Sequence, residues 1–183
     1  IRDLETAETA INAALTGHLM LSTIHTNSAA GTIPRLLAMG VQPFLLAPSL
    51  NAVIGQRLAR KLCPDCKVED TKIDNTTMTT ILNSLNEISP ESGNKPELTN
   101  LKFYTAKGCD KCQELGYKGR IGIYEVMLMS PDIEKIILSG QSSEYEIEKV
   151  DVAAGMITML QDGLLKAIEG ITSIDEVFDK VKA

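Results

Sequence analysis

Two pairs of cysteines, each with a two-residue gap, constrain the fold of this chain more than any other feature. Cys63 and Cys66 form the first pair, Cys109 and Cys112 form the second, and the 183 residues contain no other cysteine. The gap lets both thiolates of a pair reach one metal ion, and two pairs complete a tetrahedral shell of four sulfurs. Such a shell suits Zn²⁺, with an iron–sulfur site as the rarer option. A closed shell leaves no open position for chemistry, so we expect a structural metal centre.

The alternative is that the four cysteines form two disulfides or remain buried free thiols. Disulfide frameworks are typical of small secreted domains that are dense in cysteine, and four cysteines in 183 residues do not give that composition. After the second pair, Gly116 and Gly119 can adopt the positive-φ turns of a compact knuckle. Metal binding is therefore the favoured interpretation.

Size and charge exclude some classes of function. The chain is 44% hydrophobic and 23% charged, as in an ordinary globular protein, and can form one core or two small modules. Its net charge of −6 argues against a general nucleic-acid binder, although Arg57, Arg60 and Lys61 form a local basic patch. No apolar run approaches the ~20 residues that span a bilayer. We therefore expect a soluble, cytoplasmic protein that binds no nucleic acid.

Periodic apolar residues and turn signals predict a mixed α/β fold. One strand is expected at residues 19–24, where a mostly apolar run favours burial on both faces, and another at 120–128. Residues 67–108 read as a polar insert between the cysteine pairs. Helices are expected at residues 5–15, from Asn27 or Ser28 to about Met39, near 43–55 and 77–88, from Ser130 onward, and near 143–153, 157–169 and 173–182.

These elements suggest three parts. A buried strand with helices before and after it indicates an α/β core with a C-terminal helical subdomain. We assign residues 1–62 to the core, 63–119 to the four-cysteine insert, and 120–183 to the final core strand and the helical subdomain. Ser173 and Glu176 match the capping box that would open the last helix.

Both histidines of the chain flank the first predicted strand. His25 and Thr26 follow its carboxyl end, which is where ligands bind in open α/β sheets. His18 lies at the opposite end, so the two histidines share a site only if the chain curls. The plainer interpretation is that His18 is a turn residue with satisfied hydrogen bonds and His25 simply ends the strand.

The histidine segment carries a resemblance to a known family. The run IRDLETAETAINAALTGHLMLSTIHTN resembles the end of the Walker B segment and the histidine box of the secretion ATPases, in particular those of type IV pilus assembly and type II secretion. Three later segments are similar to the same family in the same order: PRLLAMGVQPFLLAPSLNAVIGQRLARKLCPDC, GCDKCQELGYKGRIGIYEVM and QDGLLKAIEGITSIDEV. The resemblance covers nearly the whole chain except the 67–108 insert.

This resemblance implies part of a RecA-like P-loop ATPase core in a hexameric motor. It implies that ATP and Mg²⁺ are cofactors of the full-length protein, and that hydrolysis drives pilin or pseudopilin assembly. The expected partners are further copies of the chain, an inner-membrane platform protein and a cytoplasmic adaptor, with the motor peripheral at the inner membrane. By resemblance His18 and His25 are the first and second histidines of the box, with His25 near the γ-phosphate. Arg2, Asp3 and Glu5 would be the tail of Walker B.

The resemblance is incomplete at the nucleotide site. The 183 residues contain no GxxxxGK[ST] phosphate loop, and the Walker B glutamate would precede Ile1. Those groups cradle phosphates and hold Mg²⁺. We therefore expect this sequence to be a piece of a longer chain that does not hydrolyse ATP alone.

Two other functions compete with the motor. One is a non-catalytic zinc-containing interaction module that docks a membrane platform protein or a neighbouring subunit. The other is a zinc-ribbon nucleic-acid adaptor, which the acidic balance disfavours. The sequence leaves open whether a motor would serve pilus assembly, type II secretion or competence.

Overall fold

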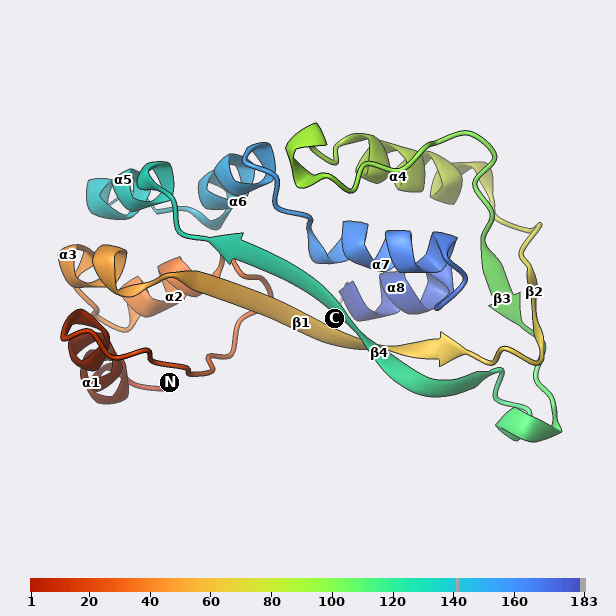
Figure 1. The fold of residues 1–183 in the computed structure, drawn as a ribbon, viewed down its shortest axis with the longest axis horizontal. Coiled ribbons are helices and arrows are strands. Elements are labelled where there is room, and N and C mark those ends of the chain that lie inside the picture. Colours follow the sequence, from red (N-terminus) through yellow and green to blue (C-terminus); the bar gives the residue numbers. More distant parts are fainter. Residues whose placement is uncertain (141, 182–183) are drawn as a thin grey trace. The chain divides into compact units, whose positions relative to one another are not determined.

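The computed structural model describes residues 1–140 and 142–181 as a mixed α/β chain (Figure 1). The chain divides into two compact units. Unit 1 contains Ile1–Gly55 and Val126–Met156, and unit 2 contains Gln56–Glu125 and the residues from Ile157 onward. The three-part division from the sequence stays a prediction.

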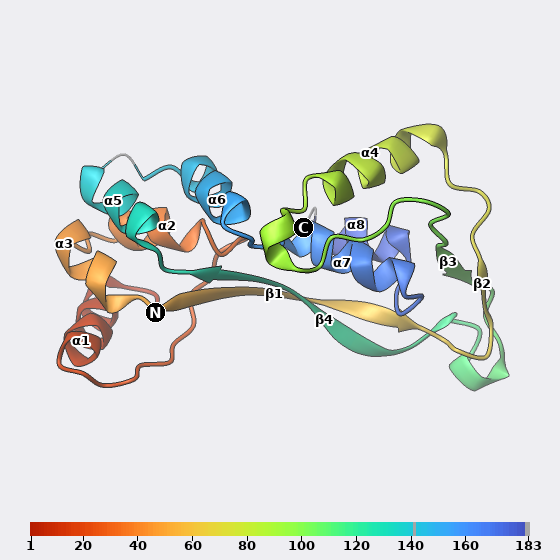
Figure 2. The same ribbon diagram turned by 45° about the horizontal axis from the view of Figure 1, so that its top comes forward.

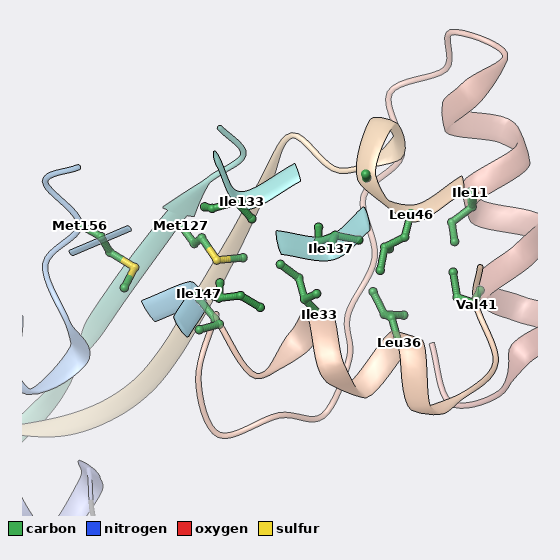
Figure 3. Close-up of a cluster of buried hydrophobic side chains, with 14 residues drawn as sticks. Ile11, Ile33, Leu36, Val41, Leu46, Met127, Ile133, Ile137, Ile147 and Met156 are labelled. Atoms are coloured by element: carbon green, nitrogen blue, oxygen red, sulfur yellow. The ribbon is translucent and has the colours of Figure 1, made fainter. Parts of the chain in front are cut away.

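Unit 1 is built mainly from helices around one apolar core. Its helices are α1 (Leu4–Leu15), α2 (Thr32–Ala38), α3 (Pro43–Leu46), the short 3₁₀ helix η1 (Ala47–Ser49), α5 (Pro131–Ser139) and α6 (Glu144–Ala153). Each contributes side chains that are removed from water, which is the main favourable term in folding. Val41, Met127 and Met156, which lie outside these helices, join the same core. Figure 3 shows its larger side chains: Ile11, Ile33, Leu36, Val41, Leu46, Met127, Ile133, Ile137, Ile147 and Met156.

Unit 2 has a separate core and carries the cysteines. Its helices are α4 (Asn75–Asn86), the 3₁₀ turns η2 (Pro90–Ser92) and η3 (Asp110–Cys112), α7 (Met159–Ile168) and α8 (Ile174–Val181). Helices α7 and α8 approach closely, because a Cβ on Gly163 would lie 2.6 Å from Cγ1 of Val177. The buried core residues come from α4, α7, α8 and the segment before β3: Ile81, Leu85, Ile88, Phe103, Leu164, Ala167, Ile174 and Val177.

Two pairs of strands complete the chain. The long strands β1 (Ala52–Leu62) and β4 (Tyr117–Leu128) are hydrogen-bonded neighbours, and Figures 1 and 2 draw them running in opposite directions. The short strands β2 (Lys67–Glu69) and β3 (Tyr104–Ala106) pair antiparallel, with Lys67 opposite Ala106. The boundary between the units falls within β1 and β4.

Most of the helices expected from the sequence are present. Helices α1, α4, α6, α7 and α8 lie within a few residues of their predicted positions, and β4 covers the strand expected at 120–128. Ser130 caps α5 by accepting a hydrogen bond from the backbone N–H of Ile133 at 3.3 Å, with Pro131 in the first turn. Helix α2 begins at Thr32, later than Asn27 or Ser28, because Ser28 accepts from Gly31 N–H and shapes the preceding turn. Among the described residues, no helix is long and apolar enough to cross a membrane.

The predicted strand at residues 19–24 is wrong for this structure. The segment is irregular, and the side chains of Leu19 and Leu21 are 82% and 87% exposed. A strand forms only when a neighbouring strand accepts and donates its backbone hydrogen bonds. In the described part of the chain, two strand pairs form between other segments, and residues 19–24 have no strand partner.

The predicted helix at 43–55 is wrong beyond its first half. Helix α3 ends at Leu46, η1 contains Pro48, and strand β1 begins at Ala52. Proline cannot continue a helix interior. Exposure then alternates along β1, as it does in a half-buried strand.

Candidate metal centre

The four cysteines of unit 2 converge on one point. Cys63 follows β1, Cys66 precedes β2, Cys109 caps the turn η3, and Cys112 ends that turn. Their sulfur atoms all lie within 4.8 Å of one another, although 42 residues separate the two pairs in the sequence. The predicted cluster of four sulfurs is therefore present, and it can hold a metal ion.

Distances between the sulfurs fit a tetrahedral site. The Sγ–Sγ distance is 3.9 Å from Cys63 to Cys109, 3.8 Å from Cys66 to Cys112, and 3.7 Å from Cys109 to Cys112. A tetrahedron with Zn–S bonds of about 2.3 Å has edges of about 3.8 Å. The four thiols are free, so the disulfide interpretation is wrong for this structure.

The sulfur of Cys112 accepts hydrogen bonds from backbone N–H groups. The backbone N–H groups of Cys109 and Gly116 each donate to Sγ of Cys112 at 3.2 Å. Burial opposes ionisation of Cys112, but these donors stabilise its thiolate and lower its pKa to about 7. Burial and hydrogen bonding to neighbouring thiols raise the pKa of Cys66 to about 12, and burial also raises the pKa of Cys109. Only the thiolate form binds a metal ion.

The loop that carries the second cysteine pair (residues 108–116, the second cysteine loop) has a tightly turned backbone. Gln113 and Glu114 have positive φ angles of 53° and 61°, and Glu114 N–H donates to the carbonyl of Cys109 at 3.0 Å. Gly108 is required beside them, because its φ is +89° and a Cβ there would lie 2.6 Å from the carbonyl oxygen of Glu114. This turn brings Gly116 back toward the sulfurs.

An ion pair links the two cysteine loops. Lys111, between the second pair of cysteines, donates to Asp65, between the first pair, at 2.5 Å. Hydrogen bonding to Lys111 holds the pKa of the Asp65 carboxyl below its ordinary value. This contact was not predicted from the sequence. The one available signal was an acidic residue in one CxxC motif and a basic residue in the other.

The two histidines lie in unit 1 and have different surroundings. His18 Nδ1 lies 3.2 Å from Thr16 Oγ1 and 3.3 Å from the carbonyl oxygen of Ala13. These contacts match the interpretation of His18 as a turn residue at the end of α1. His25 is exposed, and its ring makes no hydrogen bond with the described residues. No contact brings the two histidines together in this part of the chain.

The residues assigned to a Walker B tail also lie in unit 1. Arg2, Asp3 and Glu5 are exposed, and Asp3 caps α1 by accepting from Thr6 N–H at 2.9 Å. Arg2 and Asp3 therefore precede α1, and Glu5 lies in its first turn.

Comparison with known proteins gives matches along nearly the whole chain. The family described as "Type II/IV secretion system protein" matches residues 1–179. The type IV pilus assembly ATPase PilB of Pseudomonas aeruginosa is 48% identical over 177 residues, which are 97% of this chain and 29% of that protein. The type II secretion system ATPase E of Vibrio cholerae is 42% identical over 182 residues, covering 100% of this chain and 33% of that protein. The chain thus spans about a third of the length of these relatives.

A solved structure shares the fold. The structure described as the pilus retraction motor PilT with bound ADP aligns with a TM-score of 0.56 and 22% sequence identity. The alignment covers 98% of this chain and 37% of that one. At this identity the likeness concerns the fold alone.

Proposed function

Because the chain belongs to the family of type II/IV secretion system proteins, we propose that it is the C-terminal part of a hexameric motor ATPase. The whole motor would couple ATP hydrolysis to pilus or pseudopilus assembly. The observation that carries this proposal is the identity of 48% to a pilus assembly ATPase and 42% to a type II secretion ATPase over nearly the entire chain. Its site of action would be the cytoplasmic face of the inner membrane, beside a platform protein and a cytoplasmic adaptor.

Unit 1 would contribute the second half of a RecA-like nucleotide site. In this assignment His25 meets the terminal phosphate, His18 supports the segment, and Arg2, Asp3 and Glu5 lie next to the Mg²⁺ site. The resemblance of residues 1–27 to the end of the Walker B segment and the histidine box supports the assignment. The exposed histidine ring is free to contact a nucleotide.

ATP and Mg²⁺ would be held mainly by residues outside these 183. A phosphate loop supplies the backbone donors and the lysine that cradle the phosphates, and no such motif occurs in the chain. The 183-residue chain alone would therefore bind ATP weakly and not turn it over.

The four cysteines would hold one structural Zn²⁺ in unit 2. Three of the sulfur–sulfur distances, at 3.7–3.9 Å, support this choice because they match the edges of a zinc–thiolate tetrahedron. When bound, the ion supplies a cross-link between the two cysteine loops and no reaction chemistry. Its whole coordination shell would be filled by Cys63, Cys66, Cys109 and Cys112. The ion pair between Asp65 and Lys111 would hold the two loops together around it.

A non-catalytic interaction module is the second candidate function. The four-sulfur cluster supports it equally, since a metal cross-link would stiffen the cysteine loops in either case. The two candidates differ in what the whole protein does with ATP.

The test is ATP turnover by the purified whole protein and by the 183-residue chain in parallel. The motor proposal expects Mg²⁺-dependent turnover by the whole protein only, together with loss of pili or of secretion when that protein is deleted. A whole protein that assembles with its platform protein but neither binds nor hydrolyses ATP would contradict the motor and favour the interaction module.

A further inference from the structure

A short segment before and within α8 attaches to the residues that flank the cysteines. Leu62, which precedes Cys63, donates its backbone N–H to the carbonyl of Ile171 at 2.8 Å. The Thr172 hydroxyl donates to the carbonyl of Arg60 at 2.8 Å. The end of β1 is therefore fastened to residues more than a hundred positions later in the chain.

A buried carboxylate makes the second set of contacts in this region. Glu176, in the first turn of α8, is only 1% exposed. It accepts three hydrogen bonds from Arg60: from the backbone N–H at 2.9 Å, from Nε at 2.8 Å and from Nη2 at 2.6 Å. A buried carboxylate is costly unless charged donors satisfy it. This pairing therefore fixes α8 against β1 in one position.

The same arginine reaches the second cysteine loop through an aromatic ring. The Arg60 guanidinium lies 4.2 Å from the centroid of the Tyr117 ring, and the Tyr117 hydroxyl lies 2.8 Å from Ser173 Oγ. Tyr117 directly follows Gly116. The N–H of Gly116 donates to the sulfur of Cys112, and its carbonyl accepts from the backbone N–H of Cys63 at 2.9 Å.

A third contact reaches the residue after Cys66. Lys67 Nζ donates to the carbonyl of Gly170 at 3.1 Å and lies 5.1 Å from the centroid of the Tyr104 ring. The backbone N–H of Lys67 also donates to the carbonyl of Cys63 at 3.0 Å. Segment 170–176 thus contacts residues next to Cys63, next to Cys66 and on the strand that leads away from Cys112.

We propose that Arg60 and Glu176 are positioning residues for the four-cysteine centre, so that docking of α8 and binding of the metal ion strengthen each other. The inference rests on the proposed zinc site. Neither residue touches the ion; they hold the strand ends that carry its ligands. Coupling between two sites is reciprocal, so removing the ion weakens the docking of α8, and weakening the docking lowers the affinity for the ion.

The test measures zinc affinity of the 183-residue chain by competition with a chromophoric chelator. Glu176→Gln removes the charge and keeps the side-chain volume. Asp175→Asn is the matched control, because it makes the same change at the neighbouring exposed position in the first turn of α8. We expect Glu176→Gln to weaken zinc binding about tenfold or more, within the range of roughly 5–150-fold that coupled sites typically show, and Asp175→Asn to leave it within about twofold. Circular dichroism checks that each variant is folded.

Four outcomes are informative. If Glu176→Gln folds and binds zinc as tightly as Asp175→Asn does, the positioning role is overturned and the zinc site stands. A wild-type chain that binds no zinc overturns the zinc site itself, and the inference with it. If Glu176→Gln does not fold, hydrogen exchange of the wild-type chain decides. Faster exchange of the α8 amides after chelation supports the coupling, and unchanged exchange there overturns it.

Discussion

At the scale of single residues, the two histidines differ in the contacts that their side chains make. His18 is held at the end of α1 by Thr16 and the carbonyl of Ala13, whereas the ring of His25 is exposed. A side chain engaged in local structure is a poor candidate for a nucleotide contact. His25 therefore carries the proposed role at the terminal phosphate.

In the whole protein, we predict that His25→Ala lowers kcat about 100-fold while nucleotide affinity changes little. A donor placed where charge develops in phosphoryl transfer acts on the transition state, and losing one costs roughly 10²-fold. His18→Ala is the matched control and lowers turnover less. Steady-state kinetics and nucleotide binding of both folded variants check this. Turnover at the parent rate by His25→Ala would remove that residue from the site.

Glu176 gives a prediction about pH at the same scale. Burial alone would raise the pKa of this carboxyl, but hydrogen bonds from Arg60, with Lys180 nearby, hold it below its ordinary value. The pairing therefore stabilises the fold above the pKa of an unfolded glutamate, about 4.3. That stability is lost as pH falls through the lower folded-state pKa. Measuring the free energy of unfolding as a function of pH checks this. As pH falls, we expect Glu176→Gln to lose less stability than the parent chain, and identical pH dependence of the two chains would contradict the prediction.

At the scale of elements, local signals in the sequence located helices better than strands. Ser130 and Pro131 predicted the start of α5 because a cap and a proline act within one turn. The run at 19–24 looks like a buried strand, yet strand formation depends on a neighbour that can lie anywhere in the sequence. The start of strand β1 was missed because residues 43–55 read as one helix.

The candidate metal centre was likewise predicted only in part. The spacing of the cysteines predicted that the four sulfurs come together. The contacts that support them could not be read from the sequence, because Asp65 and Lys111 are 46 residues apart, and Arg60 and Glu176 are 116 apart. Ser173 and Glu176 matched a capping box, and Glu176 N–H does donate to Ser173 Oγ at 3.3 Å. The carboxylate of Glu176 turned instead to Arg60.

Packing of α7 against α8 gives a prediction for a helical glycine. Alanine normally stabilises a helix relative to glycine by about 1 kcal/mol, but a Cβ on Gly163 would lie 2.6 Å from Val177. We expect Gly163→Ala to destabilise the chain by about 1–3 kcal/mol, as overpacking does. Val177→Ala in the same chain relieves the clash, so the double variant is more stable than additivity allows. Denaturant unfolding of the four chains checks this, and a more stable Gly163→Ala would contradict it.

At the scale of the whole molecule, the two units have separate cores, and the cysteines belong to unit 2. Removing the metal ion should therefore loosen residues 63–120 and α8 while the core of unit 1 stays protected. A metal ion that closes a long polar loop contributes most where apolar packing is weakest. Hydrogen exchange before and after chelation checks this. Loss of protection throughout both units would show that the metal supports the whole fold.

The proposed role of unit 2 depends most directly on the four cysteines sharing one metal ion. The decisive measurement is the metal content of the purified chain combined with X-ray absorption at the zinc edge. We predict close to one zinc per chain, surrounded by four sulfurs at about 2.3 Å, with no protein disulfides. Metal-free protein with two disulfides, or zinc bound by fewer than four sulfurs, would contradict the account.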